Sequence, residues 1–277
     1  MRRHRRIRAG VVYLAALLLL LSVGFPLIWM LLSSLKPSAQ LFTSPPKFWS
    51  GSLTLEWYRS VAFSSGAPRL FLNSFLVAIW TTVICLTGGC LAAYSVTRFD
   101  FPGKQTFMIG ALVSYVFPAI VLFVPIFFIL NAIGLVDTLA GIVLAHTVLT
   151  FPLAVWMLRS FFLGIPKEID EAAWVDGASY LRTFILVILP LTLPGIFSVG
   201  IFVFALSWNE YLFASILATS GINKTIPVGI AEYITSFDIR WGEIMALGTL
   251  TTIPVVVLFL GAQKYFLRGV LAGAVKG

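Results

Sequence analysis

The sequence predicts an all-α, polytopic membrane protein with six transmembrane helices, and two observations carry this fold class. Apolar residues make up 59% of the 277-residue chain and charged residues only 11%, whereas soluble domains carry about 25% charged residues. Six apolar runs are also long enough to cross about 30 Å of hydrocarbon, which takes about 20 helical residues. These runs cover residues 11–32, 70–97, 105–136, 138–158, about 191–216 and 244–263.

Each run is expected to be a helix, because backbone groups in lipid need hydrogen-bond partners within the same segment. The runs are too long and too uniformly apolar for barrel strands of about ten alternating residues. Little more than Asp137 separates the third run from the fourth, so the turn at residues 131–138 must be tight. Prolines are expected to kink three helices: Pro118 and Pro125 in the third, Pro152 in the fourth, Pro190 and Pro194 at the start of the fifth.

Basic residues indicate the orientation. If the N-terminus is cytoplasmic, 13 of the 19 Lys and Arg residues lie in cytoplasmic segments, so the positive-inside rule favours both termini in the cytoplasm. The expected location is the cell (plasma or inner) membrane. The net charge of +8 comes from basic residues that cluster at helix ends on one side of the membrane. A nucleic-acid-binding protein would instead carry a stripe of basic residues along a phosphate backbone, so no nucleic-acid partner is expected. The first run exceeds the 7–15 apolar residues or so of a secretory signal peptide, so it is interpreted as a retained helix behind a basic segment, residues 1–10.

Several chemistries are not expected of this chain. The sequence has no G-x-x-x-x-G-K-[ST] loop, no apparent nucleophile–base pair, and no His/Cys/Asp/Glu cluster with metal-ligand spacing. Cys85 and Cys90 would point about 140° apart on a helix, which disfavours a disulfide or a metal pair. We therefore expect neither an enzyme, nor a catalytic residue, nor a bound metal or cofactor, and any ATP hydrolysis would occur in a separate subunit.

Residues 168–190, EIDEAAWVDGASYLRTFILVILP, form a polar interruption between two apolar runs and hold four of the eleven acidic residues. The segment must therefore lie at a membrane surface, and the charge asymmetry places it inside. Ala172 and Ala173 are small enough to let two surfaces approach closely. Gly177 allows a tight bend after one helical turn, and Pro190 permits a new helix to start. An ordinary amphipathic interfacial loop is the alternative.

This segment resembles the EAA loop of permease subunits of binding-protein-dependent ABC importers. Residues 72–104 and 226–277, including the tail QKYFLRGVLAGAVKG, are similar to the carbohydrate branch with its MalG-like subunits. The resemblance covers about residues 70–277 and departs at Val187, where isoleucine is more frequent. It implies the type I ABC importer permease fold. The implied parts are a first helix at 11–32, an extracytoplasmic segment at 33–69, an ABC type-1 transmembrane domain at 70–266 with its coupling loop at about 164–185, and a cytoplasmic tail at 267–277.

The resemblance implies a permease subunit of an ATP-driven sugar importer, forming half of the translocation pathway. Implied partners are a second homologous permease, two ATPase subunits that bind ATP and Mg, and an extracytoplasmic sugar-binding protein. A polyol or glycerol-phosphate importer stays open. An ion-coupled secondary carrier would need paired intramembrane acids or broken-helix ion sites, for which Glu210 and His146 are the candidates. A non-transporting scaffold has no positive support in the sequence.

The resemblance also implies two groups of residues that would contact the ATPases. In that family the EAA loop docks into a cleft of the ATPase, and the tail inserts between the two ATPase subunits. The coupling group is Glu171, Ala172, Ala173, Asp176 and Gly177. The tail group is Gly273, Ala274 and Lys276, in a segment too rich in small residues to fold alone.

Two further groups concern the substrate. W-N-E-[YF]-L-F is frequent in carbohydrate permeases, so Trp208, Asn209 and Glu210 are candidates for the translocation pathway or the subunit interface, with interfacial snorkelling as the alternative. His146 is interpreted as satisfied by a neighbouring helix rather than as a proton relay. The outer loop at 220–243 combines aromatic and polar residues suited to sugars, or merely anchors at the interface. Its candidates are Asn223, Tyr233, Phe237 and Trp241.

Overall fold

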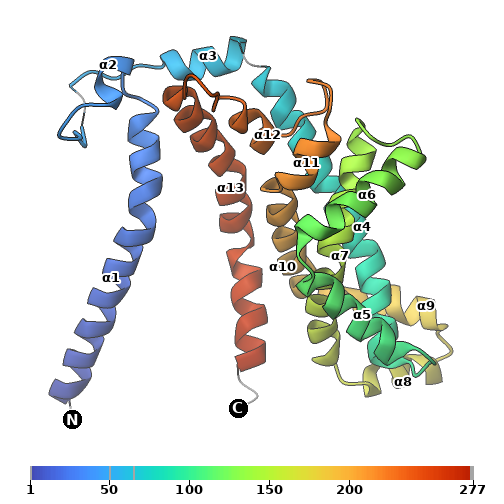
Figure 1. The fold of residues 1–277 in the computed structure, drawn as a ribbon. Coiled ribbons are helices and arrows are strands. Elements are labelled where there is room, and N and C mark those ends of the chain that lie inside the picture. The colour runs from blue at the N-terminus through green and yellow to red at the C-terminus, as the bar shows by residue number, and fades with distance from the viewer. Residues whose placement is uncertain (1, 50, 65, 275–277) are drawn as a thin grey trace. The chain divides into compact units, whose positions relative to one another are not determined.

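The computed structural model describes residues 2–49, 51–64 and 66–274 (Figure 1). Within these ranges the regular structure is helical, apart from an isolated antiparallel bridge between Ile234 and Ile239. Among the described residues, five helices are long and apolar enough to cross a membrane, and one bent helix pair brings the total to six if it is counted as one span. The predicted all-α membrane fold is confirmed.

The chain divides into two compact units. One comprises residues up to Pro68 together with Gly229–Pro254, and the other comprises Arg69–Val228 with the residues from Val255 onwards. The first unit holds α1 (Arg2–Ser33), α2 (Ser38–Leu41), α3 (Glu56–Ser64) and the first part of α13 (Trp241–Ala274). The short helix α12 (Ile226–Ala231) falls at the boundary along the sequence.

In the first unit, the segment between α1 and α3 folds into a small cap around Lys36. Its ammonium group donates to the carbonyl of Lys47 at 2.7 Å and lies 4.2 Å from the ring centre of Trp29. Trp57 Nε1 donates to the carbonyl of Lys36 at 2.7 Å, and burial lowers the pKa of Lys36. Trp49 is 61% exposed. Trp57 is thus part of this cap, whereas the exposed Trp49 is suited to an anchor at the membrane interface.

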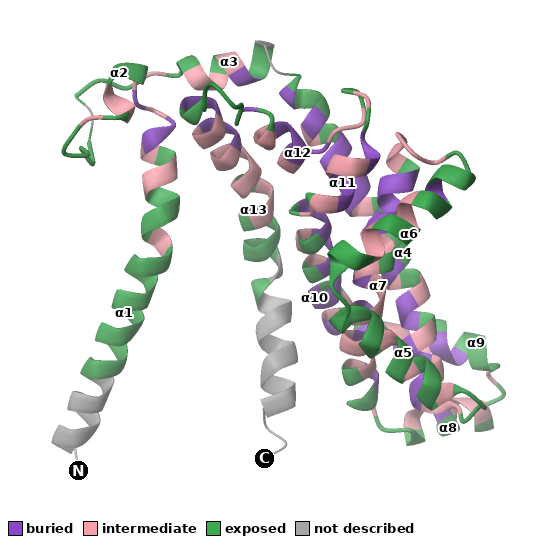
Figure 2. Cartoon of the chain, in the orientation of Figure 1, coloured by how far each residue is buried: buried purple, intermediate pink, exposed green. Residues whose placement is uncertain are grey.

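The second unit holds the remaining helices, and its core lies between α4, α7 and α10, where buried residues concentrate in Figure 2. Lipid is as apolar as leucine, so close packing rather than exclusion of water stabilises such helix contacts. The helices are α4 (Ala67–Arg98), α5 (Lys104–Val116), α6 (Ala119–Ala132), α7 (Leu139–Leu163), α8 (Glu168–Val175), α9 (Tyr180–Thr183), the π-helix η1 (Phe184–Ile188), α10 (Leu189–Trp208) and α11 (Leu212–Leu217). Core residues include Cys85 and Ala93 from α4, Ala154 and Leu158 from α7, and Val199 and Val203 from α10.

The third apolar run is not the single kinked helix that the sequence predicted. It breaks into α5 and α6, which are bent by 106°. Phe117 at the break has φ −67° and ψ 133°, an extended conformation, because the ring of Pro118 disfavours a helical residue before it. Pro125 and Pro152 lie inside α6 and α7, which continue through them.

The fifth apolar run also differs from its prediction. The helix does not start at Pro190 but at Tyr180, after Ser179 caps it by accepting from Arg182 N at 3.4 Å. It passes through the widened π turn η1 directly before Pro190, which leaves room for a ring that would clash with a carbonyl in an α-helix. The helix then ends at Trp208, so Glu210 lies in a break between α10 and α11 rather than within a helix.

Asp137 organises the tight turn between α6 and α7. Its backbone has φ 60°, which Asp tolerates better than most residues, and its N–H donates to the carbonyl of Leu217 at 2.9 Å. The carboxylate accepts from the N–H and the hydroxyl of Ser220, both at 3.0 Å. These donors hold the pKa of Asp137 below its ordinary value. The turn is therefore tied to the segment after α11.

Candidate functional site

The EAA-like segment forms a short helical hairpin, α8 followed by α9. Gly177 has φ +85°, a conformation that L side chains rarely adopt, and its N–H donates to the carbonyl of Trp174 at 3.0 Å. Ala178 N donates to the carbonyl of Ala173 at 3.0 Å and helps to close the end of α8. The bend that the sequence placed at Gly177 is therefore present.

One side of this hairpin faces away from the rest of the second unit. Glu171, Ala172, Asp176 and Gly177 are exposed, and Ala173 is half-buried. Next to them, the apolar side chain of Val175 is 87% exposed. We call Glu171, Ala172, Val175, Asp176 and Gly177 the α8 outer face. Small, acidic and apolar groups together make a surface against which another protein can pack closely. The docking of an ATPase there stays a prediction.

The opposite side of α8 holds a residue whose role the sequence reasoning missed. Asp170 is 1% exposed and forms an ion pair with Arg98, the last residue of α4. A signal was available in the helical spacing, because Asp170 shares a face with the half-buried Ala173 and Trp174, three and four residues later. A carboxylate on that face had to be buried and paired.

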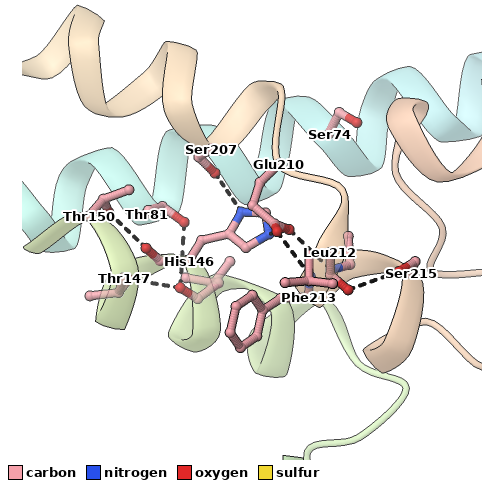
Figure 3. Close-up of polar contacts among 12 residues, drawn as sticks. Ser74, Thr81, His146, Thr147, Thr150, Ser207, Glu210, Leu212, Phe213 and Ser215 are labelled. Carbon is pink, nitrogen blue, oxygen red and sulfur yellow. Dashed lines mark hydrogen bonds and ion pairs between the residues drawn. The ribbon is translucent and has the colours of Figure 1, made fainter. Parts of the chain in front are cut away.

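His146 and Glu210 form a second polar cluster, shown in Figure 3. His146 projects from α7 and is 1% exposed. Its Nε2 lies 2.8 Å from Glu210 Oε2, and its Nδ1 shares a 2.8 Å hydrogen bond with the hydroxyl of Ser207 on α10. Both ring nitrogens are therefore engaged, as the interpretation of a histidine satisfied by a neighbouring helix expects.

Glu210 also fixes the start of α11 (Figure 3). Its two carboxylate oxygens accept from the backbone N–H groups of Phe213 at 2.9 Å and Ala214 at 3.1 Å. These N–H groups belong to the first turn of a helix and lack partners within it, so an acidic side chain suits them in both hydrogen bonding and charge. Glu210 thus joins α7, the break after α10, and α11.

The other two pathway candidates are placed differently. Trp208 is 2% exposed, stacks on Phe204 with ring centres 5.5 Å apart, and lies 6.3 Å from the ring of Phe71. Asn209 is exposed, and its amide donates to the carbonyl of Ala205 at 2.8 Å. A substrate could reach Asn209 directly, whereas contact with Trp208 would require the core to move. The translocation role of all three residues stays a prediction.

The outer-loop candidates fall into both units. Asn223 belongs to the second unit, where its amide donates to the carbonyl of Asp137 at 2.6 Å. In the first unit, Tyr233 is buried under the guanidinium of Arg240, which lies 5.0 Å from its ring centre.

Phe237 and Trp241 line an open cavity of about 430 Å³ in the first unit. Phe237 is fully exposed, and Trp241 is 39% exposed, with its ring 6.5 Å from that of Phe42. These two aromatics remain available to a partner, whereas Asn223 and Tyr233 are occupied within the chain.

The tail group is reached only in part. The helix α13 was expected to end near residue 263, but its backbone continues to Ala274 and includes Gly273. Residues 267–274 of the tail thus continue the helix of the last span, and the contact of this tail with an ATPase stays a prediction. Lys276 lies outside the described residues.

Comparison with known proteins agrees with this architecture. Residues 85–272 match the family described as "Binding-protein-dependent transport system inner membrane component". The chain is similar to the trehalose/maltose transport system permease protein MalG of Thermococcus litoralis, with 34% identity over 99% of each chain. It is also similar to the sulfoquinovosyl glycerol transport system permease protein SmoH of Agrobacterium fabrum, with 35% identity over 96% of this chain and 93% of that one.

A solved structure shares the fold. One chain of a bacterial ABC transporter involved in the import of the acidic polysaccharide alginate superposes with a TM-score of 0.80 at 20% identity, covering 95% of this chain and 98% of that chain. This likeness confirms the expected type I ABC importer permease fold. Because the family match spans well over half of the sequence, the chain belongs to the family of binding-protein-dependent transport system inner membrane components.

Proposed function

We propose that this chain is a permease subunit of an ATP-driven sugar importer, and that a separate ATPase docks on the α8 outer face. The observation that carries the proposal is a short helix with one side buried and the EAA side chains exposed on the other. The relatives' substrates, trehalose or maltose and a sugar–glycerol conjugate, support a sugar or glycoside as the substrate class. Almost equal identities accompany different substrates, so identity alone does not choose the sugar.

The proposal includes the partners and the orientation. A second homologous permease would complete the pathway, two ATPase subunits would bind ATP and Mg, and an extracytoplasmic binding protein would deliver the sugar. Both termini and the α8 outer face would be cytoplasmic, as the charge asymmetry favours. The chain itself would need no cofactor.

The His146–Glu210 cluster supports an importer subunit over an ion-coupled carrier. A carrier needs an acidic group that exchanges its ion during transport. The carboxylate of Glu210 instead contacts His146 and two backbone N–H groups. A group with this many internal partners is suited to holding helices together.

Reconstitution tests the proposal directly. The chain would be co-expressed with a second permease, an ATPase and a binding protein of the same organism and placed in proteoliposomes. Uptake of labelled disaccharides should require both ATP inside and binding protein outside. Uptake that runs on a proton or sodium gradient without ATP would contradict the proposal in favour of a carrier.

A charge reversal tests the docking face. Glu171→Lys should reduce ATPase co-purification and sugar uptake by at least about tenfold. A partner surface complementary to Glu171 would be basic, so the new lysine would face like charges, which costs several kcal/mol across an interface. The matched control is Glu56→Lys, which reverses an exposed acid on α3 in the other unit. Wild-type ATPase binding in the Glu171→Lys subunit would place the docking surface elsewhere.

A further inference from the structure

A buried ion pair joins the EAA helix to a helix that is distant in sequence. Arg98 ends α4, and Asp170 lies in the first turn of α8. Arg98 Nε is 2.8 Å from Asp170 Oδ2, and the two side chains are 2% and 1% exposed. Two charges this deeply buried are tolerated only when they are paired and hydrogen-bonded.

Two hydrogen bonds accompany this ion pair. Tyr94, one turn before Arg98 on α4, donates its hydroxyl to Asp170 Oδ1 at 2.7 Å. Arg98 Nη2 donates to the carbonyl of Ile165 at 3.0 Å, in the connection between α7 and α8. We call Tyr94, Arg98 and Asp170 the α4–α8 clamp. Tyr94 thus adds a hydrogen bond to the ion pair between Arg98 and Asp170, and the bond to Ile165 holds the guanidinium in place.

Aromatic rings close around the clamp. The ring of Tyr94 lies 4.9 Å from that of Phe184 in η1 and 5.9 Å from that of Phe99. Phe99 in turn meets Tyr180 of α9 edge-on at 5.4 Å. These rings keep the ion pair dry, which strengthens its electrostatic attraction and adds further contacts between the end of α4 and the α8–α9 hairpin.

We propose that Arg98, Asp170 and Tyr94 are positioning residues for energy coupling: the clamp makes α4 move together with α8 when the ATPase moves. The inference rests on the proposed docking of an ATPase on the α8 outer face. The chain already connects α8 to α7 on one side and to α10, through α9 and η1, on the other. The clamp adds α4, so a displacement of α8 reaches three long helices of the second unit at once.

The decisive variant removes both charges together. In Arg98→Met/Asp170→Leu no charge is left unpaired, and such apolar replacements of a buried pair are often neutral or stabilising for a fold. We expect normal assembly and a loss of thermal stability of no more than about 1–3 kcal/mol from the unpaired Tyr94 hydroxyl, but the ion pair and the hydrogen bond to α8 are lost. Sugar taken up per ATP hydrolysed should then fall by about tenfold or more, as should amide-exchange protection of α8, while protection of α10 is unchanged.

Two further variants bracket this result. Tyr94→Phe keeps the ring and removes one hydrogen bond, so it should lower the coupling ratio and α8 protection by a smaller factor. The matched control is Asp100→Asn, which breaks an ion pair at the same end of α4. There Asp100 is 97% exposed and 2.9 Å from Lys104 Nζ, and removing such an exposed pair should change neither readout.

The outcomes separate this inference from the proposed function. Wild-type coupling ratio and wild-type α8 protection in the double variant would overturn the clamp's role and leave it a stability element. If the wild-type complex contains no ATPase, the proposed function fails, whereas the exchange measurement still shows whether the clamp holds α8 on α4. Loss of α8 protection with a normal coupling ratio would also overturn the inference, because attachment would then not matter for coupling.

Discussion

The ring of Phe161 on α7 occupies the space where a side chain at Gly195 on α10 would begin. Gly195 is buried and lies one residue after Pro194, inside the helix that follows the EAA-like hairpin. Because glycine has no Cβ, the aromatic ring of one helix can approach the backbone of the other closely. The packing of α7 against α10 therefore depends on this position.

Gly195→Ala should destabilise the subunit by about 1–3 kcal/mol, the usual range for overpacking a well-packed core. Thermal unfolding of the purified complex measures this effect. Gly110→Ala on α5 is the matched control, because a Cβ there meets nothing within 4 Å. In a Phe161→Ala background, Gly195→Ala should cost less stability than it does in the wild-type subunit, and an equal cost in both backgrounds would show that the collision is not the cause.

The His146–Glu210 contact predicts a graded series at Glu210. Glu210→Ala removes the contact with His146 and both bonds to α11, which should cost about 2–4 kcal/mol for a partly buried group with charged hydrogen bonds. Glu210→Gln keeps one oxygen that can accept from α11 and should cost less. Ser207→Ala removes a single hydrogen bond and should cost about 1 kcal/mol.

Uptake kinetics then separate the two roles considered for Glu210. If the residue joins helices, the milder Glu210→Gln variant should keep the wild-type KM for sugar while its melting temperature falls. A raised KM with unchanged melting temperature would instead place Glu210 on the translocation pathway.

Gly177 predicts a difference between two side chains of similar size. Its φ of +85° disfavours any β-branched residue, at about 1–2 kcal/mol, but Asn visits this region more readily. Gly177→Val should therefore uncouple ATP hydrolysis from uptake, while Gly177→Asn should retain more coupling. A Cβ at this position meets nothing within the chain, so equal loss in both variants would point to a clash with the docked ATPase rather than to backbone strain.

Much of the fold followed from the sequence because each span is a long apolar run that lipid forces to be helical. The positions at which helices break within an apolar run did not follow from the sequence. Pro118 and Pro125 lie in the same run, yet the helix breaks only at the first of them within the described residues. The break after Trp208 carries no helix-breaking residue and depends on Glu210 capping α11, a tertiary contact with His146 at its centre.

The candidate site shows the same division. The exposed EAA residues and the bend at Gly177 could be read from small residues and glycine in a polar segment. The partner of Asp170 could not, because Arg98 lies 72 residues earlier and resembles an ordinary topogenic arginine at a helix end. Local composition predicts which face is exposed, whereas the pairing of buried charges is decided by the fold.

Phe237 offers the sharpest test of the outer loop. Its ring is fully exposed at the tip of the turn closed by the Ile234–Ile239 bridge, so Phe237→Ser removes little from the fold. If the loop touches the binding protein or its sugar, uptake at low sugar concentration should fall by about fivefold or more, as for an aromatic interface anchor worth at least about 1 kcal/mol. The matched control is Phe63→Ser on α3, another aromatic that is 88% exposed.

Replacing residues 230–235 is a less specific experiment, because Tyr233 in that stretch is buried under Arg240 and supports the loop itself. Unchanged uptake in Phe237→Ser would leave this loop as an interfacial anchor and would make Asn209, exposed at the break after α10, the next residue to test for sugar contact.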